Sequence, residues 1–136
     1  MYMLDTNILV KAIRQKDHPV REKLMNAVDE GLCISAITYT ELMYGVYRSA
    51  RPQKNLMSLN ALLSWIQILP FDASAAASAG EVMAFLVGKG SPIGDRDILI
   101  AGHARSLGIP LITHNTREFD RVPDLQTEDW LAGEAL

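Results

Sequence analysis

Four short apolar runs alternate with longer segments of helical periodicity, and this alternation limits the folds open to the chain. The runs cover residues 2–4, 32–34, 66–69 and 109–113, and a polar residue or a proline follows each of them. Each run is too short for a helix and has the length of a strand. Short buried strands that alternate with helices indicate a parallel sheet covered on both faces. We therefore predict an α/β fold, a three-layer α/β/α sandwich with a central parallel sheet, formed by residues 1–136 as a single domain.

The segments between these runs carry helix start and stop signals. Helices are expected directly after Asp5 and over residues 19–30, 39–49, 53–65, 75–87 and 95–107. A single helical turn over residues 116–119 and a last short strand over residues 125–128 complete the prediction. The segment 75–87 begins with a run of Ala, Ser and Gly, so another backbone could approach it closely.

Charge limits the classes of function. The chain has 136 residues, with 13 Lys and Arg against 16 Asp and Glu and a formal net charge of −3. This balance argues against a general nucleic-acid binder. If Asp5, Glu41, Asp95 and Asp97 form a separate acidic site, 12 acidic residues remain against 13 basic ones. A mildly basic body around an acidic pocket is compatible with an RNA partner that arrives with a divalent metal ion.

Cysteine count and hydropathy bear on location. Cys33 is the only cysteine, so no internal disulfide can form, and its place in a predicted strand indicates a small buried thiol. A reducing cytoplasm fits this pattern. The amino terminus has no basic region followed by an apolar one, and no apolar run is long enough to span a bilayer. We expect a cytoplasmic protein with no membrane partner.

Polar side chains follow the predicted strands at the points where the strands end. Right-handed crossovers would bring the carboxyl ends of three strands to one rim of the sheet, where open α/β sheets bind ligands. The helix that starts at residue 95 would add its first turn to the same rim. In chain order, the candidate groups at this rim are Asp5, Glu41, Asp97 and Asn115.

Each candidate also has an ordinary structural role. Asp5 can cap the first helix, and residues 38–41 fit a capping box in which the glutamate bonds back to the helix start. Asp95 and Asp97 lie in a first helical turn, where the helix dipole favours acids. Asn115 is a common turn residue. Taken singly, none of these residues shows whether its role is structural or catalytic.

The set of acids is harder to explain as structure alone. Several carboxylates at one rim repel each other, and a divalent hard cation such as Mg²⁺ or Mn²⁺ relieves this repulsion. Such ions can support hydrolysis of a phosphodiester without a histidine or cysteine nucleophile. The three histidines, His18, His103 and His114, lack the local spacing of a zinc-binding pair.

Two other chemistries use acids at strand ends, and the residues present disfavour both. An aspartyl-phosphate phosphatase needs a second acid two residues after its nucleophile, where this chain has Asn7. A phospho-receiver needs a lysine near the last strand end, where His114 and Asn115 stand instead. Dinucleotide binding lacks its glycine motif, since no G-x-G-x-x-G follows any predicted strand.

Four stretches in register carry a resemblance to a known family. They are MLDTNIL at the start, ISAITYTELMYG around Glu41, PIGDRDILIAGHARSLG around Asp97, and LITHNTREFDRVPDLQTEDW near the end. With these motifs, which cover nearly the whole chain, the sequence resembles the PIN-domain endoribonuclease toxins of the VapC group. The resemblance implies a single PIN domain with an α/β/α sandwich around a parallel sheet.

The resemblance also implies roles for matched positions. Asp5, Glu41 and Asp97 match the three principal metal-binding acids of the family and are expected to be catalytic. Asn115 stands where many PIN domains have a fourth aspartate, and we include it among the expected catalytic residues. An asparagine is a neutral oxygen ligand, so it would hold a second metal ion weakly.

Further positions near these residues are expected to assist. Thr6 and Thr113 match small hydroxyl positions of the family that could orient a carboxylate or a bound water. Asp95 falls where the family is variable, so it is an accessory at most. Arg96 and Arg117 flank the expected site and are our candidates for contacts to RNA.

The resemblance also implies an activity and partners. Proteins of this family cleave RNA, often structured RNA such as tRNA, with Mg²⁺ or Mn²⁺. They are usually homodimers, and a small antitoxin encoded beside them inhibits them. The carboxyl-terminal segment of the antitoxin lies along a hydrophobic groove. The alternative, which the neutral Asn115 suggests, is a PIN-like module that binds RNA or a partner with weak or no nuclease activity.

Overall fold

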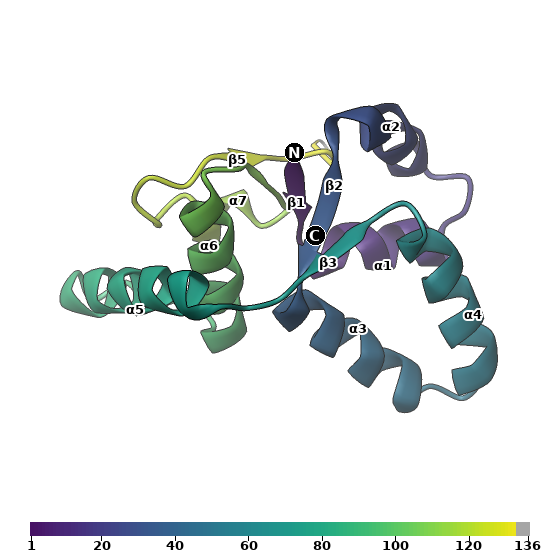
Figure 1. Ribbon diagram of the computed structural model, residues 1–136, viewed down its shortest axis with the longest axis horizontal. Helices are drawn as coiled ribbons and strands as arrows, with labels where there is room; N and C mark the ends of the chain where they lie inside the picture. Colours follow the sequence, from purple (N-terminus) through teal and green to yellow (C-terminus); the bar gives the residue numbers. More distant parts are fainter. Residues whose placement is uncertain (133–136) are drawn as a thin grey trace.

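The computed structural model describes residues 1–132, and its centre is a parallel sheet (Figure 1). Within these residues the sheet has five strands in the order β3-β2-β1-β4-β5, and every neighbouring pair is parallel. The strands are β1 (Tyr2–Leu4), β2 (Leu32–Ser35), β3 (Gln67–Leu69), β4 (Leu111–Ile112) and β5 (Thr127–Glu128). The order places β1 in the middle, with β2 and β3 on one side of it and β4 and β5 on the other. The predicted parallel α/β fold is confirmed.

The helices lie in two layers, one on each face of the sheet. Figure 1 shows α1 to α4 to the right of the strands and α5 to α7 to the left. The first group is α1 (Thr6–Arg14), α2 (Pro19–Ala27) with a 3-10 turn η1 (Val28–Glu30), α3 (Ala36–Tyr47) and α4 (Pro52–Leu63). The second group is α5 (Ala73–Gly88), α6 (Asp95–Leu107) and the one-turn α7 (Thr116–Phe119).

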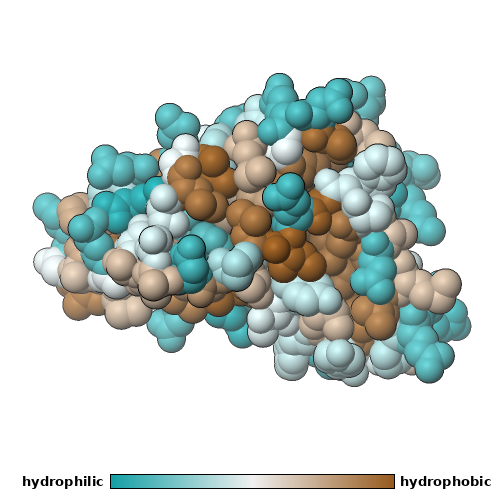
Figure 2. Space-filling model, viewed as in Figure 1, coloured by the Kyte–Doolittle hydropathy of each residue, from teal (hydrophilic) through white to brown (hydrophobic). Residues whose placement is uncertain are grey.

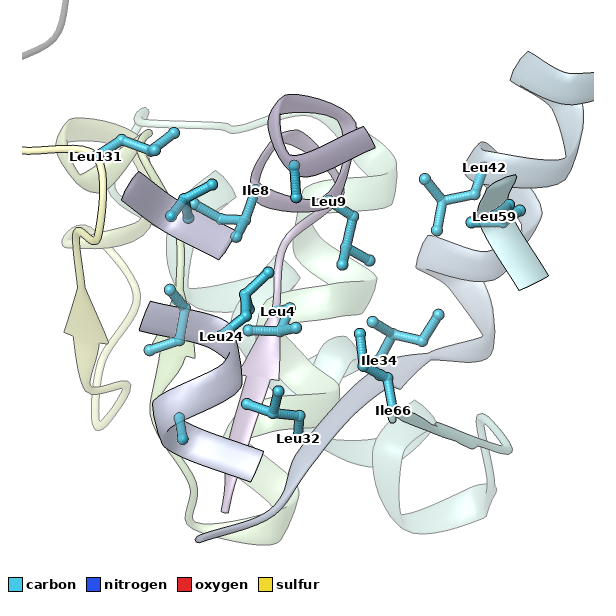
Figure 3. Packing of buried hydrophobic residues seen from close by; sticks show 14 of the residues in the cluster. Leu4, Ile8, Leu9, Leu24, Leu32, Ile34, Leu42, Leu59, Ile66 and Leu131 are labelled. Atoms are coloured by element: carbon cyan, nitrogen blue, oxygen red, sulfur yellow. The ribbon is translucent and has the colours of Figure 1, made fainter. Parts of the chain in front are cut away.

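Alternate residues of the strands supply the two cores. In β1, Met3 packs with the side chains of α5, α6 and α7, whereas Leu4 packs with those of α1 to α4. Figure 3 shows Leu4 beneath Ile8 and Leu9 of α1. Because successive side chains of a strand point to opposite faces, a strand buried on both faces must be apolar at every position. This requirement explains why the strands are continuous apolar runs.

The layer of α5 and α6 depends on a very close helix contact. A Cβ atom built on Gly102 of α6 would lie 2.4 Å from Cα and 2.5 Å from N of Ala79 in α5. Only a residue without a side chain fits at that position. The close backbone approach that the small residues of α5 predicted is therefore present, and it sets how closely α6 packs against α5.

The start of α3 differs from the prediction. The helix begins at Ala36 rather than at residue 39, because Ser35 at the end of β2 caps it and its hydroxyl accepts a 3.1 Å hydrogen bond from Ile37 N. Residues 38–41 therefore form no capping box, and Glu41 is free of that role. The buried ring of His103 lies with Nδ1 2.8 Å from Ser35 Oγ and holds this junction from α6.

Other boundaries move by a few residues. The second helix ends at Ala27 and continues as the 3-10 turn, and α4 begins at Pro52, a favourable first helical residue. The last two strands are two residues long each, shorter than the predicted runs. The helix over residues 95–107 and the turn over 116–119 have the predicted bounds.

One edge of the sheet carries exposed apolar side chains. The strand β3 is the outermost strand on its side, and Ile68 in it is 41% exposed, next to Trp65, which is 55% exposed. Figure 2, seen from the same side as Figure 1, shows hydrophobic side chains gathered around the middle of the molecule and hydrophilic ones mostly toward its outline. No helix within residues 1–132 combines the length and the apolar character needed to cross a membrane.

Candidate active site

Asp5 is the buried centre of the candidate site. It follows β1 directly and caps α1, with Oδ1 accepting a 2.8 Å hydrogen bond from Thr6 N. Oδ2 accepts a second bond of 2.8 Å from the hydroxyl of Thr113, which follows β4, the neighbour of β1 in the sheet. Asp5 is only 5% exposed. Both of its oxygens are thus held by neighbours, and the cap and the candidate ligand are the same residue.

Glu41 reaches the same place from α3. It lies in the second turn of that helix, and its Oε1 accepts a 2.6 Å hydrogen bond from the hydroxyl of Thr6. Its Oε2 lies 3.2 Å from Nε of Arg96, in the first turn of α6. Thr6 therefore joins Asp5 and Glu41: its backbone N–H bonds to the first carboxylate and its hydroxyl to the second.

A fourth carboxylate, which the sequence analysis did not include, completes the cluster. Glu118 of α7 accepts a 2.6 Å hydrogen bond from the side-chain amide of Asn115 and a 3.0 Å bond from Gly94 N. It also shares a hydrogen bond with Asp97. Asn115 therefore holds Glu118, and the acid near Asp97 comes from position 118. A usable signal was the spacing of three residues between Asn115 and Glu118, which puts both on one side of a helical turn.

The acids affect one another electrostatically. The pKa of Asp97 is raised to about 7, most strongly by burial and further by the charge of Asp5, the hydrogen bond to Glu118 and the charges of Glu118 and Glu41. Burial also raises the pKa of Asp5, against hydrogen bonds from Thr113 and Thr6. These mutual effects show that the carboxylates share one electrostatic environment.

Glu118 shifts in the opposite direction. Burial acts to raise its pKa, but hydrogen bonds from Gly94, Asn115 and Asp97 and the charge of Arg121 outweigh burial and lower it. The pair of Asp97 and Glu118 thus holds one proton. The proton stays on Asp97, which donates a hydrogen bond to the Glu118 carboxylate. Two carboxyl groups in contact commonly share a proton in this way.

The remaining candidates lie around the opening of the cluster. Asp95 is exposed and lines a cavity with Glu41, Arg96 and Asp97. Arg117 is exposed and lies beside Asn115 and Glu118 in a neighbouring pocket. Every site residue predicted from the sequence therefore lies within or next to this rim.

The carboxylates do not form a closed cage. Among the described residues, no group of three or more His, Cys, Asp or Glu side chains is arranged to hold a metal ion as it stands. The contacts explain this arrangement, because Glu41 turns toward Thr6 and Arg96 while Asp97 turns toward Glu118. The site is an open acidic rim rather than a preformed structural metal centre.

Comparison with known proteins identifies the class to which this fold and site belong. The PIN domain family matches residues 2–125, a range that contains the sheet up to β4 and all four acids of the cluster. The three-layer architecture is accordingly that of a PIN domain.

Relatives of the chain narrow the class further. The tRNA(fMet)-specific endonuclease VapC of Shigella flexneri is 46% identical over 129 residues, which are 95% of this chain and 97% of the relative. The structure of VapBC2 from Rickettsia felis, bound to a DNA fragment from its promoter, has a TM-score of 0.91, with 38% identity and coverage of 95% and 98%. DNA-bound VapBC from Salmonella typhimurium has a TM-score of 0.90, with 40% identity and coverage of 95% and 97%. The chain belongs to the VapC ribonucleases of the PIN-domain family, as the sequence motifs predicted.

Proposed function

We propose that this protein is an endoribonuclease that hydrolyses phosphodiester bonds in structured RNA such as tRNA, depends on Mg²⁺ or Mn²⁺, and acts as the toxin of a toxin–antitoxin pair. The observation that carries the proposal is the convergence of Asp5, Glu41, Asp97 and Glu118 from four separate elements at one rim. The names of the relatives, an endonuclease specific for tRNA(fMet) among them, support RNA as the substrate class.

The donor set suits a hard, hydrated cation. Carboxylate oxygens are the ligands that Mg²⁺ prefers, and Mg²⁺ usually keeps several waters and binds through one or two carboxylates plus substrate phosphate. The raised pKa values of Asp5 and Asp97 come partly from the negative charges of neighbouring acids, which a cation would offset. Asp5, Glu41 and Asp97 would hold the ion, with Glu118 beside them. When bound, the ion would activate water and stabilise charge on the phosphate.

The chain's own residues position these acids. Thr113 and the N–H of Thr6 fix the two oxygens of Asp5, so this carboxylate cannot rotate without losing a hydrogen bond. Asn115 fixes Glu118 in the same way. Such supporting hydrogen bonds maintain the orientation of metal ligands, and their loss usually weakens metal binding or activity.

Arginines at the opening are suited to RNA phosphates. Arg96 is 67% exposed in its side chain and lies beside Glu41, and Arg117 is exposed beside Glu118. An acidic rim repels RNA, so cations at its border would offset the repulsion and place the phosphate next to the acids. A guanidinium can bond two phosphate oxygens at once.

An antitoxin is the partner that we propose. A groove between α1, α3 and α4 is lined by apolar side chains, with Glu41 among its lining residues, and it would accept an apolar segment that ends in a basic side chain near the acids. Solved VapBC relatives support a partner of this kind. Apolar residues that line the groove include Val10, Ile13, Leu42, Val46 and Leu59.

A homodimer and a cytoplasmic location belong to the same proposal. The exposed apolar side chains along β3 provide surface that a second copy could bury, and the single cysteine, Cys33, is buried as predicted. Sedimentation equilibrium of the purified protein tests the dimer. A mass of one chain across the concentration range would contradict it.

Cleavage of labelled tRNA by the purified protein tests the activity. We expect discrete new RNA ends with Mg²⁺ or Mn²⁺, no cleavage in excess chelator, and loss of cleavage in Asp5→Asn. Asp17→Asn, an exposed aspartate outside the site, is the matched control and should cleave like the wild type. Cleavage that persists in chelator would overturn the metal requirement. Binding of RNA without cleavage, under every metal tried, would favour the binding module instead.

A further inference from the structure

Beside the acidic rim lies another pocket, whose lining contains basic side chains. It has a volume of about 380 Å³, and its lining includes two basic side chains, a histidine and two amides. These polar residues are Asn7, Lys11, Arg14, Gln15 and His114. The residues that line it include no Asp or Glu. A pocket of this composition suits an anion with several oxygens, such as a phosphate.

Two segments that contact Asp5 contribute residues to the pocket. Asn7, Lys11 and Arg14 follow one another at spacings of four and three residues along α1, the helix that Asp5 caps, so they share one face of it. His114 follows Thr113, whose hydroxyl holds Asp5. The polar row thus begins two residues from Asp5 and leads away from it, and any chain bound in the pocket lies next to the acids.

His114 is oriented by an acid of its own. Its Nδ1 lies 3.1 Å from both carboxylate oxygens of Asp129, and its side chain is 13% exposed. Asp129 also accepts a 2.8 Å bond from Leu131 N, which fixes the carboxylate. The ring is therefore held in one orientation in the wall of the pocket. Asp129 is one acid that contacts His114, and Lys11 and Arg14 are the basic side chains in the lining of the pocket.

The neighbouring pocket that Glu118 lines is also basic at its border. Arg117 and Arg121 line it together with Asn115 and Glu118. His114 and Asn115 are consecutive, yet they line different pockets. The loop after β4 therefore contributes to both pockets, and Glu118 of the acidic rim lines one of them. A nucleotide backbone that crosses this loop would pass basic side chains of both pockets next to the acids.

We propose that the pocket formed by Asn7, Lys11, Arg14, Gln15 and His114 is a phosphate-binding subsite for the RNA backbone next to the bond that is cut. The inference rests on the proposed ribonuclease function and extends it, because it assigns the direction in which the RNA leaves the acidic rim. The subsite offsets the repulsion between the RNA and the acids. It also sets the register of the chain, since phosphate contacts position a nucleic acid without reading its sequence.

Lys11→Gln and Arg14→Gln test the subsite, with Lys16→Gln as the matched control. Lys16 is an exposed lysine just beyond α1 and is not among the residues that line the pocket. Lys11 is the more informative position, since Arg14 also lines the apolar groove. Binding of labelled initiator tRNA is measured by fluorescence anisotropy, with Ca²⁺ in place of Mg²⁺ and a gel that verifies intact RNA. Thermal unfolding of each variant verifies that it is folded.

We expect each pocket variant to weaken tRNA binding about three- to tenfold at low salt, and the control to bind within about twofold of the wild type. The slope of log K against log salt should become shallower by about 0.7 to 0.9 for each phosphate contact removed. In cleavage assays with Mg²⁺, the loss should appear mainly in KM. Cleavage should still occur at the same positions of the RNA.

Unchanged affinity and salt slope in Lys11→Gln, with a wild type that binds and cuts RNA, would overturn the subsite and leave the ribonuclease proposal intact. An equal loss in Lys16→Gln would also overturn it, because the effect would then be general electrostatics. A wild type that neither binds nor cuts RNA would instead overturn the proposed function itself. If Lys11→Gln weakened only the complex with a co-expressed acidic protein partner, the pocket would be assigned to that partner and not to RNA.

Discussion

The hydroxyl of Thr113 donates a 2.8 Å hydrogen bond to Oδ2 of Asp5, and both side chains are buried. The two residues are 108 positions apart in the sequence and follow neighbouring strands, β1 and β4. The bond joins the carboxyl ends of these two neighbouring strands next to the other acids. It therefore serves both the stability of the sheet and the orientation of the central carboxylate.

Replacing Thr113 by valine keeps the shape of the side chain but removes this bond and the 3.0 Å bond that the same hydroxyl accepts from Asn115 N. The carboxylate of Asp5 would lose a buried donor, so we expect the free energy of unfolding to fall by about 1 to 3 kcal/mol. Urea unfolding measures this loss, and RNA cleavage should fall as well. Thr127→Val, which removes an exposed hydrogen bond to Asp120, is the control and should cost less than about 0.5 kcal/mol. Equal losses in the two variants would contradict the role of the buried bond.

Asp97 gives the metal-free protein a specific pH dependence. Its pKa is raised from 3.8 to about 7 in the folded protein, so between these values the folded chain binds more protons than the unfolded chain. Stability should therefore fall as pH rises through this window. The raised pKa of Asp5 acts in the same direction, whereas the lowered pKa of Glu118 acts only at more acidic pH.

Urea unfolding in chelator at about pH 5 and about pH 8 measures this dependence. We expect Asp97→Asn to reduce the loss of stability between the two pH values, because the titrating group is gone. Asp95→Asn, an exposed neighbour in the same helical turn, is the control and should keep the dependence of the wild type. A loss of stability in Asp97→Asn as large as in the wild type would show that other groups cause it.

Arg96 forms an ion pair with Glu41, so a metal ion that binds Glu41 would lie close to the positive charge of Arg96. The guanidinium lies 3.2 Å from Glu41 Oε2, and it places a positive charge at the opening of the acidic rim. In Arg96→Gln we expect Mn²⁺ to bind about two- to tenfold more tightly, since like charges at short distance repel. Isothermal titration calorimetry measures the affinity, with the exposed Arg51→Gln as control. Unchanged or weaker Mn²⁺ binding in Arg96→Gln would show that the pair does not oppose the ion.

Adding a methyl group should have opposite effects at two helical glycines, because Gly102 contacts Ala79 and Gly80 faces open space. Gly102→Ala would place Cβ 2.4 Å from the backbone of α5, so the helices must separate, and we expect a loss of about 2 to 4 kcal/mol. Gly80→Ala, in α5, meets no atom within 4 Å and should stabilise the protein by up to about 1 kcal/mol. Thermal unfolding compares the two variants. A tolerated Gly102→Ala would mean that the close approach is not required.

The sequence alone determined the fold class and the position of most of the site. Apolar runs without polar interruption mark strands buried on both faces, and the handedness of crossovers brings their carboxyl ends to one rim. Asp5 follows β1 directly, so its place at this rim could be predicted from the strand pattern. Glu41 could be placed at the same rim because it follows the strand over residues 32–34 by a few residues. Asp97 could be placed there because it lies in the first turn of the helix that starts at residue 95. The motifs around both residues identified the family.

Only the tertiary structure decided which groups touch. Glu118 was missed because its part in the cluster depends on contacts with Asn115, Gly94 and Asp97, and these come from segments that local patterns treat separately. The capping box at residues 38–41 was wrong for a related reason, since the end of β2 supplies the cap and His103 of α6 supports it. Hydrogen bonds and ion pairs between distant segments follow from how the helices pack on the sheet, and local periodicity carries no record of that packing.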